Sequence, residues 1–104
     1  MSRKVCVNFE VRSMAIMKDT LKNMGINYDE LGQDEVSIHK NYHNIQINAK
    51  TGNVSYDEMD SKTVNSIKQN YMVAWYKDKA IREGMQLREE RQANGEVVLT
   101  LLHN

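Results

Sequence analysis

Hydrophobic and polar residues alternate along the first segment of the chain, and the apolar side runs from Val5 to Val11. A period of two is typical of a strand with one buried face. Ser13 then stands at the position of a helix N-cap, and Gly25 at that of a left-handed C-terminal residue. Between them, apolar residues recur at helical spacing: Met14, Met17, Leu21 and Met24. This pattern predicts a strand followed by a helix.

The middle of the chain predicts three short strands. Gly32 to Glu35 is polar and indicates a loop, and Lys50-Thr51-Gly52-Asn53 indicates a turn. Around them lie the apolar positions of the strands: Val36 and Ile38, then Ile45, Ile47 and Ala49, then Val54 and Tyr56. The first two strands are expected to join around Lys40 to Asn44.

A second helix is expected from Asp60 or Ser61 to Gly84. Its predicted inner stripe consists of Val64, Ile67, Tyr71, Ala74, Ile81 and Met85. Leu87 to Gln92 then indicates a polar edge strand, and Asn94-Gly95 favours a type I′ hairpin. Val97 to Leu102 is apolar on both faces, which predicts a central strand.

The predicted order is β-α-β-β-β-α-β-β over residues 1–104, as a single α+β domain. We expect a mainly antiparallel sheet with two helices on one face, as in ferredoxin-like folds. The other face then has to be polar or to meet a partner. We therefore expect a homo-oligomer, a dimer or tetramer, with Trp75 or the sheet in the interface.

Composition narrows the classes of function. Lys and Arg number 14 and Asp and Glu number 14, so the net charge of zero argues against a duplex-DNA binder. No apolar run reaches the roughly 20 residues of a membrane helix, and Met-Ser-Arg-Lys runs directly into strand-like sequence without a secretory signal. Cys6 is the only cysteine. These features predict a cytoplasmic protein.

Three segments carry a resemblance to a known family. They are Val11–Leu21 with the helix ending Met24-Gly25, then Ile67–Tyr71 with its Gln and Tyr, and then Gly84 followed by a charged strand, Asn94-Gly95 and an apolar strand. Together they resemble the small uncharacterised reading-frame family of red-algal plastids and cyanobacteria, which has members in bacteria and phages. Asn70 stands where the family has a basic residue. The resemblance implies the fold more than the chemistry.

The phage members of that family are similar to viral proteins that sequester cyclic nucleotide immune signals of the host, the anti-CBASS sponges. Such proteins bind cyclic dinucleotides and withhold them without cleaving them. The resemblance therefore implies a non-catalytic role in immune evasion.

The sequence predicts no catalytic residue, no metal site and no cofactor. Cys6 lies on a strand without a cationic neighbour, so a nucleophilic thiol is not expected. His39 and His43 are four residues apart in a strand and turn, where a solvent-facing pair is the simpler interpretation than a metal site. The acidic residues around the loop at Gly32 to Glu35 indicate a solvated face, with a metal site as the alternative: Asp29, Glu30, Asp34 and Glu35.

Three groups of residues suit a nucleotide. Arg12 precedes the first helix, where its guanidinium and the free helix N–H groups can hold a phosphate. Tyr71 and Trp75 are one turn apart on the second helix, where Tyr71 has a core spacing and Trp75 falls beside the stripe. A predicted loop tip adds aromatic and cationic groups: Lys40, Tyr42 and His43. A salt bridge for Arg12 and a simple polar turn for the loop tip are the alternatives.

The function predicted from the sequence is the sequestration of a cyclic nucleotide by a cytoplasmic oligomer. The alternative is a protein-interaction module that acts on a cellular partner without a small ligand. A deep pocket lined with cations favours the first function, and a flat apolar patch favours the second.

Overall fold

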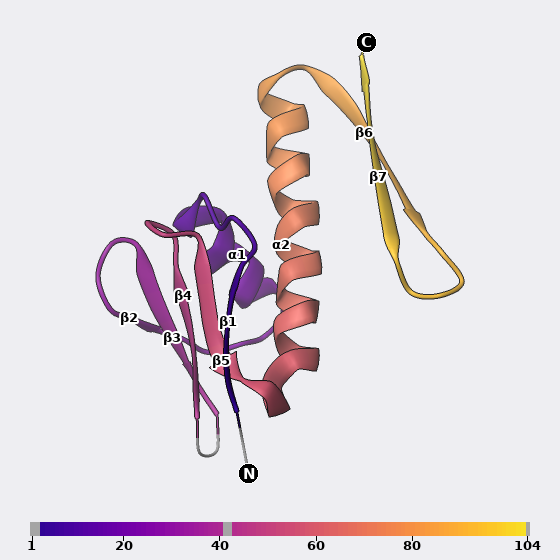
Figure 1. The fold of residues 1–104 in the computed structure, drawn as a ribbon. Helices are drawn as coiled ribbons and strands as arrows, with labels where there is room; N and C mark the ends of the chain where they lie inside the picture. The colour runs from indigo at the N-terminus through magenta and orange to yellow at the C-terminus, as the bar shows by residue number, and fades with distance from the viewer. Residues whose placement is uncertain (1–2, 41–42, 104) are drawn as a thin grey trace.

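The computed structural model describes residues 3–40 and 43–103 (Figure 1). The elements follow the predicted order, with one short strand added. They are β1 (Lys4–Asn8), α1 (Met14–Asn23), β2 (Asp29–Glu30), β3 (Glu35–His39), β4 (Asn44–Asn48), β5 (Asn53–Asp57), a 3-10 turn η1 (Glu58–Asp60), α2 (Ser61–Arg82), β6 (Met85–Arg91) and β7 (Val97–His103).

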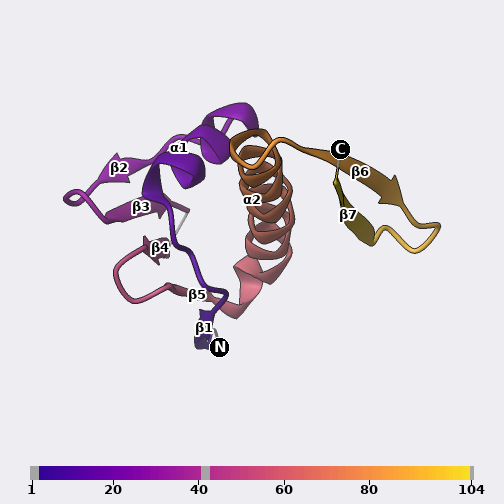
Figure 2. The ribbon, with the colours of Figure 1, turned by 90° about the horizontal axis from the view of Figure 1, so that it is seen from above.

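The main sheet has five strands in the order β1-β5-β4-β3-β2, and each neighbouring pair is antiparallel. Both helices lie on one face of this sheet (Figure 2). The predicted α+β class is therefore confirmed, and the strand order and helix count fit a ferredoxin-like arrangement.

The core lies between the inner face of the sheet and the two helices. The register pairs Val7 with Val54 and Val36 with Ile47, so apolar side chains of neighbouring strands form continuous rows. The helices close the core with Met14, Met17, Leu21, Val64, Ile67 and Tyr71.

The start and end of α1 follow the sequence prediction. Ser13 is the N-cap, and its Oγ accepts a hydrogen bond from the N–H of Ile16 at 3.2 Å. Gly25 follows the helix with φ +73°, a conformation that glycine adopts without strain. These local signals are set by neighbouring residues alone, which is why the sequence predicts them well.

The inner stripe of α2 is only partly as predicted. Val64, Ile67 and Tyr71 are buried, whereas Ile81 is 81% exposed and Ala80 is only 4% exposed. Ala80 follows Tyr71 by two and a half turns at about 3.6 residues per turn, so it lies on the opposite side of the helix. The β6–β7 hairpin packs on that opposite side, and α2 separates it from the sheet (Figure 2).

The prediction of a central strand at Val97–Leu102 is wrong. β7 pairs with β6 alone among the described residues, in a separate two-stranded sheet (Figure 1). The chain leaves α2 on the side away from the main sheet, so the hairpin cannot join that sheet. One face of β7 packs towards α2, and Val98 on the other face is 44% exposed.

The prediction of a type I′ turn at Asn94-Gly95 is also wrong. That turn needs positive φ at both central residues, and only Gly95 has one, at +89°. The N–H of Gly95 donates to the carbonyl of Gln92 at 3.0 Å, and the N–H of Gln92 donates to the carbonyl of Glu96 at 2.8 Å. This is a three-residue loop that closes with a glycine in the left-handed region.

The outer face of the main sheet is polar. A row across it consists of Cys6, Ser55, Gln46, Ser37 and Asp29, and amide side chains occupy much of the rest. Cys6 is exposed in this row, and Ser37 is 4% exposed. Because the face is polar, the main sheet does not itself require a partner to cover it.

Candidate ligand-binding site

A pocket of about 280 Å³ lies where the β1–α1 connection passes α2. We call it the aromatic pocket. It is lined by Phe9, Glu10, Arg12, Tyr71, Met72, Trp75 and Tyr76. Three of the six residues predicted to bind ligand meet here, although Arg12 lies about 60 residues before the other two along the chain.

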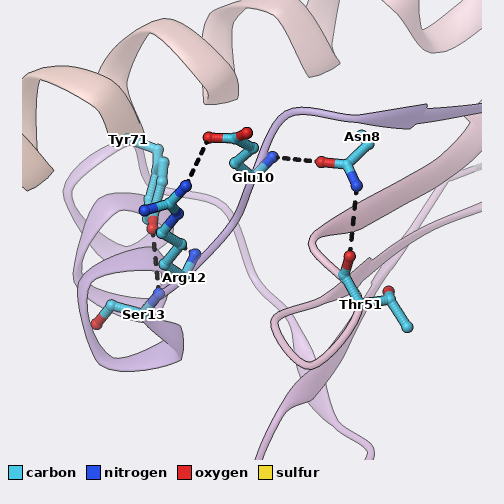
Figure 3. Close-up of polar contacts among 6 residues, drawn as sticks. All are labelled: Asn8, Glu10, Arg12, Ser13, Thr51 and Tyr71. Carbon is cyan, nitrogen blue, oxygen red and sulfur yellow. Dashed lines mark hydrogen bonds and ion pairs between the residues drawn. The ribbon is translucent and has the colours of Figure 1, made fainter.

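Arg12 already has an anionic partner in the pocket. Its Nη2 lies 3.0 Å from Oε2 of Glu10, and both side chains are about two-thirds exposed (Figure 3). Such an exposed pair contributes about 0–1 kcal/mol, so a competing phosphate can replace the carboxylate at small cost. Arg12 is thus found in a salt bridge, with Glu10 of its own segment, and the predicted phosphate contact would have to displace this carboxylate.

The backbone at Glu10 is held in an unusual conformation. Its φ is +57°, in the left-handed region that costs a residue other than glycine about 1–3 kcal/mol. The N–H of Glu10 donates to Oδ1 of Asn8 at 2.9 Å, and Nδ2 of Asn8 donates to the carbonyl of Thr51 at 3.4 Å (Figure 3). These contacts fix the segment that turns both Glu10 and Arg12 towards the pocket.

Gly52 gives this segment room. A Cβ at Gly52 would lie 3.3 Å from Oδ1 of Asn8 and 3.4 Å from the Cα of Glu10, and the φ of Gly52 is +80°. The turn between β4 and β5 therefore has to carry glycine for the β1–α1 connection to approach this closely.

Replacing Gly52 with alanine should destabilise the domain more than the same change at Gly25. Both residues have positive φ, but nothing lies within 4 Å of a Cβ at Gly25. Gly25→Ala should cost about 1–2 kcal/mol from the backbone alone. Gly52→Ala should cost about 1 kcal/mol more, because Asn8 and Glu10 must move. Urea denaturation of both variants measures the difference, and equal losses would show that the close approach contributes nothing.

The hydroxyl of Tyr71 binds two backbone N–H groups that lie just before α1. It accepts hydrogen bonds from the N–H of Arg12 at 2.9 Å and from that of Ser13 at 3.1 Å (Figure 3). The Oγ of Ser13 in turn accepts a hydrogen bond from the N–H of Ile16 and so caps α1. The N–H groups of Arg12, Ser13 and Ile16 are therefore engaged within the protein, and the predicted joint phosphate site is left with the first two N–H groups of α1, those of Met14 and Ala15. Tyr71 is 3% exposed and acts mainly as a structural residue that ties α2 to the β1–α1 connection.

Trp75 provides a partly buried aromatic wall. Its ring lies 5.2 Å from that of Tyr76 at an interplanar angle of 83°, and Nζ of Lys79 lies 5.6 Å from the Trp75 ring centroid. On the other wall, Nζ of Lys68 lies 5.9 Å from the ring centroid of Phe9. The aromatic rings are thus accompanied by positive charge, in a chain whose net charge is zero.

The predicted loop tip lies elsewhere. Tyr42 falls outside the described residues. Lys40 is exposed next to the β3–β4 turn, where its N–H donates to the carbonyl of His43 at 2.9 Å. His43 lines a second pocket, of about 410 Å³, with Lys4 and Asp57. Its Nε2 lies 3.7 Å from Oδ2 of the buried Asp57.

The loop tip with His43 and the aromatic pocket with Arg12 lie at opposite ends of β1. Lys4 begins β1 and lines the pocket with His43, whereas Arg12 follows the end of β1. The five residues of β1 alone span about 16 Å, and the two pockets share no lining residue. Within one copy of the protein, the loop tip and the aromatic pocket therefore form two separate places.

Four residues of the aromatic pocket were missed by the sequence analysis as ligand contacts: Phe9, Glu10, Met72 and Tyr76. Phe9 reads as an ordinary inward residue of the first strand. Glu10 carries a weak signal, because a carboxylate two residues from Arg12 can pair with it only if the strand ends between them. Tyr76 follows Trp75 directly, and this pair of adjacent aromatic residues is the clearest sign in the sequence of the pocket.

Residues 3–40 and 43–103 contain no group of three His, Cys, Asp or Glu side chains placed to hold a metal ion. None of the helices found there has the length and apolar character needed to cross a membrane.

No family model, no curated protein and no solved structure matches this chain.

Proposed function

We propose that the protein is a non-catalytic binding protein whose aromatic pocket holds a base and a phosphate of an anionic nucleotide. The observation that carries the proposal is the meeting of Arg12 and Trp75 in one pocket. A nucleotide needs a flat partner for its base and a cation for its phosphate, and these two side chains supply both. The proposed ligand is a cyclic nucleotide, in keeping with the resemblance to viral sponges.

The size of the pocket limits what one copy can hold. At about 280 Å³ it lies at the lower end of the range for small-molecule pockets, about 300–1,000 Å³. We therefore expect one base with its phosphate in each copy. A cyclic dinucleotide would then extend beyond the pocket or be shared between two copies.

The pocket offers binding without an evident chemical step. Arg12 and Trp75 can fix a phosphate and a base, but hydrolysis also needs an activated nucleophile and a group to stabilise the leaving oxygen. We propose that bound nucleotide is released unchanged. Chromatography of the ligand after heat denaturation tests this, and turnover beyond one equivalent would contradict it.

A thermal-shift screen against cyclic mono-, di- and trinucleotides identifies the ligand class. A ligand at about 100 times its Kd adds roughly 2.7 kcal/mol of stability, which gives a clear rise in Tm. Absence of any shift across the panel at millimolar concentration would contradict nucleotide binding.

Substitutions at Arg12 and Glu10 should change affinity in opposite directions. Arg12→Ala removes the phosphate contact and should weaken binding about tenfold, or about 1.4 kcal/mol. Glu10→Gln releases Arg12 and removes a negative charge from the pocket, so binding should tighten about two- to fivefold. Calorimetric titration with the nucleotide from the screen measures both.

Arg3→Ala is the matched control for Arg12→Ala. Arg3→Ala removes the same charge as Arg12→Ala. The side chain of Arg3 is 80% exposed, and its Nε lies 3.9 Å from Oε2 of Glu58. Arg3→Ala should bind as the parent does. If Arg12→Ala also binds as tightly as the parent, or if Glu10→Gln weakens binding, the phosphate assignment is wrong.

The second candidate function is the protein-interaction module. The observation that favours it is the exposure of a large apolar side chain on α2, Met72, which is 41% exposed. Met72 also lines a shallow groove of about 850 Å³ between α2 and the hairpin loop. A panel without any thermal shift, together with weaker capture of a cellular protein by Met72→Glu, would favour this function over nucleotide binding.

A further inference from the structure

The hairpin leaves one strand edge of β7 open. β7 pairs with β6 on one side, and no other described strand pairs with it. The N–H of Gln92 donates to the carbonyl of Glu96, and the register continues without a bulge from Arg91–Val97 to Met85–His103. Hydrogen-bonded pairs alternate along an antiparallel ladder. The backbone N–H and carbonyl groups of Val97, Leu99 and Leu101 therefore point to the open edge.

The two edges of the hairpin differ in charge. β6 has the sequence Met-Gln-Leu-Arg-Glu-Glu-Arg, and charged side chains on an edge oppose pairing with another strand. β7 has the sequence Val-Val-Leu-Thr-Leu-Leu-His, without an acidic or a Lys or Arg side chain. Only the β7 edge is therefore free of the charges that usually prevent strand addition.

The exposed face of β7 is also uncharged and largely apolar. Val98 is 44% exposed, and Thr100 and Leu102 lie on the same face of the strand. A two-stranded hairpin has marginal stability by itself, and here it rests on one helix alone (Figure 1). An additional strand along β7 would bury this face partly and satisfy the open backbone groups.

We propose that the occupant of this edge is β7 of a second copy, paired antiparallel about a twofold axis. The edge is complementary to itself, because an uncharged apolar strand meets an identical strand without like-charge opposition. The product is a four-stranded sheet in the order β6-β7-β7-β6, with charged β6 strands at both outer edges. The interface lies on the hairpin, and not on the main sheet, whose outer face is polar.

Two double variants test the pairing. Val98→Lys/Thr100→Lys and Val98→Glu/Thr100→Glu place charges along the edge. Positions 98 and 100 face Glu90 and Arg88 within the hairpin, so each double variant gains one favourable and one unfavourable cross-strand pair there. The stability of the hairpin itself should therefore change little, and by a similar amount in the two double variants. Across the twofold axis, each variant alone opposes like charges.

Sedimentation velocity is the readout. The parent should be a dimer, each double variant alone should have a dimer Kd at least about tenfold higher, and a one-to-one mixture of the two should restore a heterodimer. The control Gln86→Lys adds a charge to the same face on β6 and should dimerise as the parent does. A monomeric parent at about 100 µM, or double variants that self-associate as tightly as the parent, would overturn the proposal.

Amide hydrogen exchange tests the same edge without any substitution. The N–H groups of Val97, Leu99 and Leu101 should exchange more slowly as the parent concentration rises through the dimer Kd. If these amides exchange at one rate at all concentrations while the protein dimerises, the dimer uses another surface and the proposal fails.

Discussion

Replacing Tyr71 with alanine should remove about 3–5 kcal/mol from the free energy of unfolding. The ring is 3% exposed and lies 6.4 Å from that of Phe9, so its removal leaves a cavity between α2 and the end of β1. The total stability of a domain of this size is about 5–15 kcal/mol, so this variant should be close to unfolding. Urea denaturation followed by circular dichroism measures the loss.

Tyr71→Phe separates the hydroxyl from the ring. It keeps the packing but leaves the N–H groups of Arg12 and Ser13 without their acceptor, which should cost about 1–3 kcal/mol. A phenylalanine variant as stable as the parent would show that the hydroxyl does not tie α2 to the β1–α1 connection. An alanine variant that loses less than 1 kcal/mol would contradict the placement of Tyr71 in the core.

Replacing Trp75 with alanine should weaken nucleotide binding about 5- to 100-fold, which corresponds to about 1–3 kcal/mol for one base stacked on an aromatic ring. The reason is that Trp75 supplies the largest flat surface in the aromatic pocket. Calorimetric titration, performed at a temperature where the variant is folded, measures the change.

Trp75→Phe is the control for Trp75→Ala. It preserves a flat ring at the same position, so its affinity should fall less than that of the alanine variant. Both variants weaken the cation–π contact between Lys79 and the ring at position 75, so both should lose some stability. Equal affinity of the alanine variant and the parent would show that the base does not stack on Trp75.

The sequence predicted the fold well where local patterns determine it. The first strand, the cap at Ser13 and the glycine after α1 depend on neighbouring residues, and each is found in the structure. The strand ends at Asn8, three residues before the predicted alternation does, and Glu10 then has a left-handed backbone. β2 was missed because two residues, Asp29 and Glu30, are too short to show a period.

The errors in the fold have a common cause. The apolar pattern of Val97 to Leu102 shows that the strand can be buried on both faces, but not which element covers it. The same holds for Ile81 and Ala80, since the side of α2 that becomes buried depends on where the hairpin returns. These features depend on tertiary packing, which periodicity along the chain does not contain.

The candidate site was predictable in its residue types and only partly in its assembly. Arg12 and Trp75 were chosen for their chemistry, and the fold brings them to one pocket. The hydrogen bonds from the N–H groups of Arg12 and Ser13 to Tyr71 were not predictable, because the partners lie 59 and 58 positions apart along the chain. The pairing of Arg12 with Glu10 depends on the left-handed backbone of Glu10, which its side chain does not favour.

The fluorescence of Trp75 provides the most direct test of the central claim, because it is the only tryptophan of the chain. Its emission is to be followed while the parent is titrated with the nucleotide that gives the largest thermal shift. We predict a saturable change in Trp75 emission with the same Kd as calorimetry gives, and a curve displaced to higher concentration in Arg12→Ala. A nucleotide that binds by calorimetry and leaves Trp75 emission unchanged would contradict binding in the aromatic pocket.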